Sequence, residues 1–194
     1  MRTDIIWYLQ KEIRVRCEAP SNKFGMGCYY HIKAVVKNAE LLAERYNADK
    51  EVTVIAAWLH DIASVTDISL YKEHHIHGAE MSEEILERFG YDKEKTELVK
   101  KCIINHRGSI KSADGIKKTM EEIYVADADA ISHFDNVPSL LFLAYSTNGM
   151  DYDEGIEFVI GKLKRSYAKL SGGSREFYRS KYENAMEILC GNGK

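Results

Sequence analysis

The chain has 194 residues, of which 45% are hydrophobic and 29% are charged, as in an ordinary soluble globular protein. This composition excludes a disordered chain, a collagen-like repeat and a coiled-coil rod. The 27 basic and 30 acidic residues leave a net charge of -3. Because no overall positive field would attract nucleic acid or anionic lipid, we expect no nucleic-acid polymer as a partner.

The sequence offers neither a membrane span nor a signal peptide. The longest uncharged stretch, residues 136–150, contains Pro138 and several polar residues, whereas a span needs about 20 mostly apolar residues. Lys11 and Glu12 follow the short apolar run 5–9 too closely for a signal peptide. We therefore expect no membrane partner and a cytoplasmic protein.

The cysteines lie far apart and form no Cys-x-x-Cys pair; they are Cys17, Cys28, Cys102 and Cys190. In a reducing compartment this spacing predicts free thiols. It excludes a zinc knuckle, which would need paired thiolates.

Apolar residues recur with a helical period along nearly the whole chain. The pattern predicts an all-α protein of eight or nine helices. In chain order, the expected helices cover about 30–46, a segment from Val52, a segment ending at Phe89, a segment opened by Asp92, about 118–133, a short segment from Pro138, 151–170, and 174–190.

Several helix ends carry capping signals. Asp49 is a plausible N-cap, and Gly90 a left-handed C-terminal cap. Asp151 with Glu154 three residues later has the spacing of a capping box. A break at 171–173 precedes the final helix, which Ser174 is expected to cap. The longest loops are expected after residues 61 and 106, and long loops often carry function.

An ionisable pair, His60-Asp61, ends the apolar segment 55–59. Burying such a pair is unfavourable unless something compensates. A divalent metal does so, since imidazole and carboxylate suit Mn, Fe, Ni, Zn or Mg. Further ligands are available from His31 and from the acidic residues Asp127 and Asp129. These two aspartates lie about 200° apart around a helix, so they should not share a face.

In this order, His31, the segment 56–62 with His60 and Asp61, and Asp129 after Ala128 resemble the His…His-Asp…Asp signature of the HD-domain superfamily of metal-dependent phosphohydrolases. The resemblance implies that these four residues bind one divalent metal ion. It implies Asp129 as the ligand because the family's aspartate commonly follows a small residue.

The resemblance covers about residues 28–135. Together with the helical pattern of the whole chain, it predicts a single HD-like domain, 1–194, with the C-terminal helices 138–190 packing onto that core.

Some branches of the superfamily add two histidines that create a second metal site bridged by the aspartate of the His-Asp pair. His77 and His106, both expected at helix ends, are the candidates here. Their alternative role is to bind substrate phosphate or to orient the other ligands. His74 and His75 are expected in a loop, although one of them could replace His77, and His133 is expected at the surface or as a cap.

Cationic residues near this motif suit an anionic substrate. Arg107 directly follows His106 and can grip a phosphate with its planar guanidinium, and Lys72 lies after the His-Asp pair. The resemblance implies a metal-dependent phosphohydrolase acting on a nucleotide or other small phosphoester. Asp61, Arg107 and Lys72 are the expected catalytic residues, with a metal-activated water as nucleophile.

Two alternatives remain open at this point. If His77 and His106 complete a di-iron site, the chain could resemble the oxygenase branch of the superfamily, which iron content and O₂ consumption would reveal. A non-catalytic nucleotide sensor would bind a nucleotide without turnover. The sequence also leaves open the choice of metal, one ion or two, and the oligomeric state.

Overall fold

The computed structural model describes residues 1–107 and 118–191. No β-strand occurs within these two ranges, so the prediction of an all-α protein is confirmed. The elements in chain order are α1 (Thr3–Glu18), α2 (Gly27–Tyr46), α3 (Lys50–Leu59), α4 (Ile62–Thr66), the 3-10 helix η1 (Ile68–Glu73), α5 (His74–Arg88), α6 (Lys93–Asn105), α7 (Met120–Asp135), α8 (Val137–Phe142), the π-helical turn η2 (Leu143–Thr147), α9 (Tyr152–Lys169) and α10 (Gly172–Cys190).

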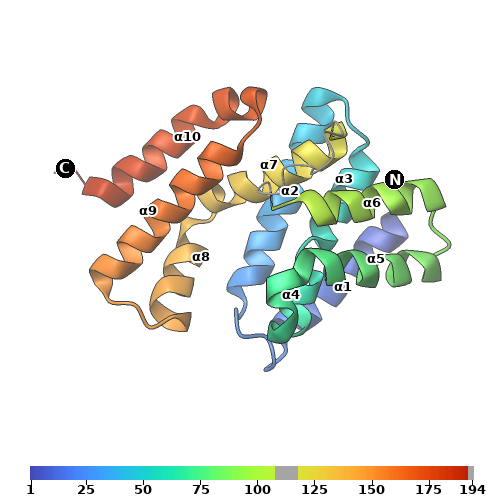
Figure 1. Cartoon of the computed structure of the whole chain (residues 1–194), viewed down its shortest axis with the longest axis horizontal. Helices are drawn as coiled ribbons and strands as arrows, with labels where there is room; N and C mark the ends of the chain where they lie inside the picture. Colours follow the sequence, from blue (N-terminus) through green and yellow to red (C-terminus); the bar gives the residue numbers. More distant parts are fainter. Residues whose placement is uncertain (108–117, 192–194) are drawn as a thin grey trace.

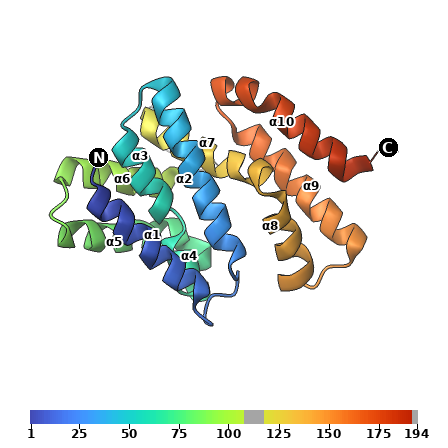
Figure 2. The same ribbon diagram turned by 180° about the vertical axis from the view of Figure 1, so that it is seen from behind.

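Helices α2 and α7 pack against each other in the middle of the molecule (Figure 1). Helices α1 and α3 to α6 lie on one side of this pair and α8 to α10 on the other, as the view from behind also shows (Figure 2). Two apolar clusters fill these sides: Ile5 and Ile55 belong to the first, Ile131 and Leu163 to the second. Helices α2 and α7 contribute side chains to both clusters, so they join the two halves of the core.

Helix α1 is absent from the helices expected above. Its buried residues Ile5, Leu9 and Ile13 recur every four positions, as expected of a helix. The continuous apolar run 5–9 obscures this repeat in the sequence. Near its end, the thiol of Cys17 lies 3.1 Å from that of Cys28 on α2 (Sγ to Sγ). All four cysteines are free thiols, as expected.

Most of the expected caps are present. The Asp49 carboxylate accepts hydrogen bonds from two backbone N–H groups at the start of α3, Gly90 has a φ of +58°, and Asp151 and Glu154 form a reciprocal capping box. The cap of α10 was predicted wrongly. The helix begins after Ser171, and Ser174 lies buried in its first turn.

The segment after Asp61 is more ordered than the expected long loop. It forms α4 and η1, and the Asp67 carboxylate accepts a hydrogen bond from the backbone N–H of Ser69 at the start of η1 (2.8 Å). Helix α5 follows η1 without a break and therefore begins at His74. Among the described residues, no helix combines the length and apolar character needed to cross a membrane.

Candidate metal centre

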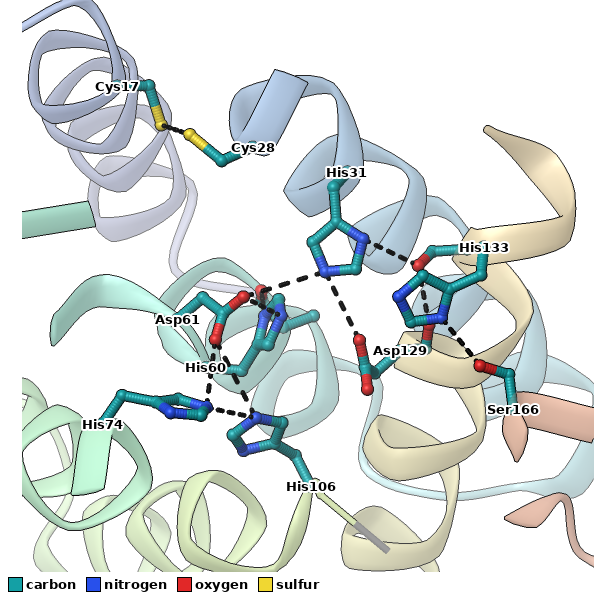
Figure 3. Close-up of polar contacts among 12 residues, drawn as sticks. Cys17, Cys28, His31, His60, Asp61, His74, His106, Asp129, His133 and Ser166 are labelled. Atoms are coloured by element: carbon teal, nitrogen blue, oxygen red, sulfur yellow. Dashed lines mark hydrogen bonds and ion pairs between the residues drawn. The ribbon is translucent and has the colours of Figure 1, made fainter. Parts of the chain in front are cut away.

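Three buried histidines stand where a helix ends, and Figure 3 shows their rings around Asp61. Each ring is held by its Nδ1 atom. The last carbonyls of a helix lack partners within that helix, so a side chain three residues later can donate to them. The contacts are His60 Nδ1 to Ala57 O (2.8 Å), His74 Nδ1 to Tyr71 O (2.7 Å) and His106 Nδ1 to Ile103 O (2.5 Å). Because a carbonyl only accepts, Nδ1 carries a hydrogen, and in the neutral ring Nε2 therefore has the lone pair that can bind a metal ion.

The ring of His31, on α2, is also held by its Nδ1 atom, in this case by a hydroxyl group of α7. The Ser132 hydroxyl donates to the carbonyl oxygen of Asp129 (2.6 Å) and accepts from His31 Nδ1 (3.0 Å). The Nε2 atom of His31 then faces Asp129 Oδ1 at 3.3 Å. All four rings therefore turn Nε2 toward the carboxylates.

The Asp61 carboxylate lies between two groups of possible metal ligands. Its Oδ2 is 3.4 Å from His60 Nε2 and 3.8 Å from His31 Nε2. Its Oδ1 is 3.3 Å from His74 Nε2 and 3.9 Å from His106 Nε2. The ligand atoms of each group lie within 4.8 Å of one another; the groups are His31, His60 and Asp129, and Asp61, His74 and His106.

These residues fit a divalent metal ion. His60 is fully buried, and its Nε2 makes no hydrogen bond to any residue that the structure describes. A buried polar atom left without a partner is destabilising by about 1–3 kcal/mol. Imidazole nitrogen with carboxylate oxygen is the donor set that Mn, Fe, Ni and Zn accept. A metal ion at this position would satisfy the lone pair.

The electrostatics of the cluster also favour a cation. Desolvation opposes ionisation of Asp61, but the charges of His60, His74 and His106 outweigh it and hold the pKa of Asp61 far below its usual range. Burial opposes protonation of His60, but the Asp61 and Asp129 carboxylates raise its pKa to about 9. Burial, together with the charge of His60, lowers the pKa of His106 to about 4. Two ionised carboxylates thus face imidazole rings that are not all positively charged.

The structure does not bring His77 into this cluster. Because α5 begins at His74, the expected ligand His77 does not start the helix and lies about one helical turn beyond His74. The His77 side chain is 37% exposed, and its Nδ1 lies 3.3 Å from Glu80 Oε2. His74, which the sequence left as the alternative, lies in the cluster instead. His74, His60 and His106 each follow the end of a helix, and this common position is the sequence feature that could have identified His74.

His133 is buried, contrary to the expected surface position. Its ring stacks on that of His31, with 5.2 Å between the ring centroids. Its Nδ1 lies 3.1 Å from the hydroxyl oxygen of Ser166 on α9 (Figure 3). His133 therefore links α9 to the candidate metal centre.

Two adjoining cavities open onto the cluster. The first, called here the polar cavity, has a volume of about 220 Å³ and contains three cationic side chains, Arg107, Lys162 and Lys169, beside the histidines and aspartates. The second, of about 140 Å³, is lined largely by apolar side chains such as Phe24 and Leu140. A compound bound beside the centre could therefore place an anionic group in the polar cavity and an apolar group in the second cavity.

The two expected cationic residues differ in position. Arg107 lines the polar cavity, and its Nη1 donates to the backbone carbonyl of Lys72 at 3.2 Å. The side chain of Lys72 does not line that cavity. Lys72 thus contributes a carbonyl oxygen that positions Arg107. The position of the Lys72 side chain does not support the expected catalytic role of its ammonium group.

Asp127 and Asp129 have separate roles, as their different helix faces predict. The Asp127 carboxylate accepts hydrogen bonds from Ser171 N (3.0 Å) and Ser171 Oγ (2.5 Å). We expect Asp127→Ala to lower the free energy of unfolding by about 1–3 kcal/mol, because buried donors lose their acceptor. Its metal content should not change. Asp129→Ala should instead lower the metal content.

Urea denaturation of chelated protein and metal-to-protein ratios of untreated protein measure the two effects. Loss of metal from a folded Asp127→Ala variant would contradict this division of roles, as would full metal content in Asp129→Ala.

Comparison with known proteins supports the HD-type arrangement. The family described as HD domain matches residues 28–133. An uncharacterized protein of Clostridium beijerinckii is 31% identical over 107 residues, which make up 54% of this chain and 66% of that protein. The match therefore spans just under two thirds of that relative's length.

Solved structures show the same fold. The crystal structure of Bacillus subtilis YpgQ has a TM-score of 0.69 and 18% identity, covering 97% of this chain and 93% of YpgQ. YpgQ in complex with ADP has a TM-score of 0.65 and 20% identity, covering 93% and 94%. A predicted HD superfamily hydrolase from an uncultured Thermotogales bacterium has a TM-score of 0.63 and 18% identity, covering 94% and 88%.

Proposed function

Because the chain belongs to the HD domain family, we propose that it is a metal-dependent phosphohydrolase whose substrate is a nucleotide or another small phosphoester. The observation that carries this proposal is the position of Asp61 between the two groups of ligand atoms. Its Oδ2 faces one group and its Oδ1 faces the other. The three cations of the polar cavity support an anionic substrate. The similar fold of YpgQ, whose structure is known with ADP, supports a nucleotide.

The chain offers ligands for two metal ions. His31, His60 and Asp129, with Asp61, would hold the first, and His74 and His106, again with Asp61, would hold the second. A divalent ion bound there would lower the pKa of a water molecule toward about 7 and so supply hydroxide at neutral pH.

The hydrogen bonds to the Nδ1 atoms keep each imidazole in the tautomer whose Nε2 is free to coordinate. Outer contacts of this kind are worth about 10- to 100-fold in metal affinity or activity. They come mainly from backbone carbonyls at helix ends, so the fold itself orients the ligands.

Arg107 would bind and orient the phosphoryl group. The carbonyl oxygen of Lys72 holds one guanidinium nitrogen, which leaves other N–H groups to donate to phosphate oxygens in the polar cavity. A cation at this place stabilises the charge that develops on the phosphoryl oxygens during attack.

The test is phosphate release from nucleoside mono-, di- and triphosphates and from p-nitrophenyl phosphate by protein purified without chelator. Chelation should abolish release and metal readdition should restore it. Arg107→Ala should keep its metal and lose about 2 kcal/mol of transition-state stabilisation, roughly 30-fold in kcat/KM.

Metal-loaded protein that releases no phosphate from any of these compounds would refute the proposal. Nucleotide binding without turnover would then favour the sensor. O₂ consumption by iron-loaded protein would favour the oxygenase, for which the second histidine group is the relevant observation.

A further inference from the structure

Helix α9 lies outside the residues that match the HD domain, yet it contacts the candidate metal centre. Ser166 on α9 is 2% exposed, and its hydroxyl group lies 3.1 Å from His133 Nδ1. The ring of His133 in turn stacks on that of His31 (Figure 3). These contacts fix which face of α9 is turned toward the centre.

Two lysines lie on that same face. Lys162 precedes Ser166 by four residues and Lys169 follows it by three, and residues at such spacings lie on one side of a helix. Both lysines line the polar cavity together with Arg107. Helix α9 and the end of α6 therefore bring three cations to one cavity.

Neither of these two lysines is in ion-pair contact with an acidic side chain that the structure describes, although Asp61 and Asp129 line the same cavity. Lysines elsewhere in the fold, such as Lys50 and Lys100, form ion pairs with glutamates. Neither Lys162 nor Lys169 forms an ion pair with any residue in 1–107 or 118–191. Desolvation lowers the pKa of Lys169, and although Asp129 opposes this, the charges of Lys162 and Arg107 lower it further. An anion in the cavity would relieve this excess of positive charge.

We propose that Lys162 and Lys169 bind a second anionic group of the substrate, distinct from the phosphoryl group at the metal centre. The inference rests on the proposed function, in which Arg107 and the metal ions already neutralise the phosphoryl group that is attacked. The two lysines then remain for a neighbouring phosphate. They would make the site select compounds with two or more linked phosphates over monoesters.

The test is calorimetric binding of inorganic pyrophosphate and of orthophosphate in saturating Mg²⁺. Lys162→Gln and Lys169→Gln should each weaken pyrophosphate binding by about 10- to 100-fold, the effect of one lost charge-assisted contact. Orthophosphate affinity and metal content should change little. Lys162→Arg and Lys169→Arg keep the charge and should keep much of the affinity.

Lys164→Gln is the matched control, because Lys164 lies on α9 and is exposed, as Lys169 is, but does not line the polar cavity. It should bind pyrophosphate as the wild type does. The inference is overturned if the Lys162 and Lys169 variants match this control, or if wild type binds pyrophosphate no more tightly than orthophosphate. Because binding and phosphate release are measured separately, lysine-dependent binding in a protein that hydrolyses nothing would refute the proposed function and leave the lysine site standing.

Discussion

Asp61→Ala should remove metal from both groups of ligands at once and lower kcat/KM by about 10³-fold or more, since metal ions supply several kcal/mol of transition-state stabilisation. The reason is geometric. Asp61 is the residue whose two oxygens face different histidine pairs, at 3.4–3.8 Å on one side and 3.3–3.9 Å on the other. Elemental analysis and phosphate release on the same preparation measure both effects.

Asp61→Asn separates charge from shape, because it keeps the size of the side chain and removes the negative charge. It should also lose metal. Asp127→Ala is the control, since Asp127 is a buried acid on α7 whose partner is Ser171. That variant should lose stability and keep its metal. Full metal occupancy in Asp61→Ala would refute the assignment of Asp61 as a shared ligand.

The order of the motif along the chain was sufficient to select His31, His60, Asp61 and Asp129, which the structure brings together. Helical periodicity places such residues on helices, and a metal is a physical reason for ionisable groups to occur at the ends of apolar segments. The same reasoning favours His77 over His74, whereas the structure brings His74 into the second group of ligands. That choice depends on where α5 begins.

The start of α5 follows from the short elements before it. Residues 68–73 form a 3-10 helix, which advances by about 2.0 Å per residue compared with 1.5 Å in an α-helix. Apolar periodicity does not reveal such a segment, because none of its residues is buried. The Asp67 cap is the local signal that could have found it.

Lys162 and Lys169 could not be selected from the sequence for a different reason. Exposed lysines on an amphipathic helix are ordinarily solvated charges, and no motif marks these two. Their significance depends on the packing of α9 against α7, which the contact between Ser166 and His133 records. A local sequence pattern does not predict how distant segments pack together, so it could not place these lysines at the site.

His74→Ala should reduce the metal-to-protein ratio from two to one, while His77→Ala should leave it at two. His74 Nε2 lies 3.3 Å from Asp61 Oδ1 and 3.2 Å from His106 Nε2, so its removal takes a ligand only from the second group. The first group, with His31, His60 and Asp129, stays complete. His106→Ala should have the same effect as His74→Ala, because the two histidines complete the same group.

His77 is the matched control, since it lies three residues from His74 on the same helix and pairs with Glu80. Ratios measured after loading with iron, manganese or zinc decide between the alternatives. A ratio of one in wild type and in all three variants would refute the dinuclear site and assign His74 and His106 to the substrate. A further outcome is that the ratio falls as expected while His74→Ala still releases phosphate faster than Asp61→Ala. In that case the first ion and the cations of the polar cavity are sufficient for hydrolysis. An oxygenase with a di-iron centre would not release phosphate in this way.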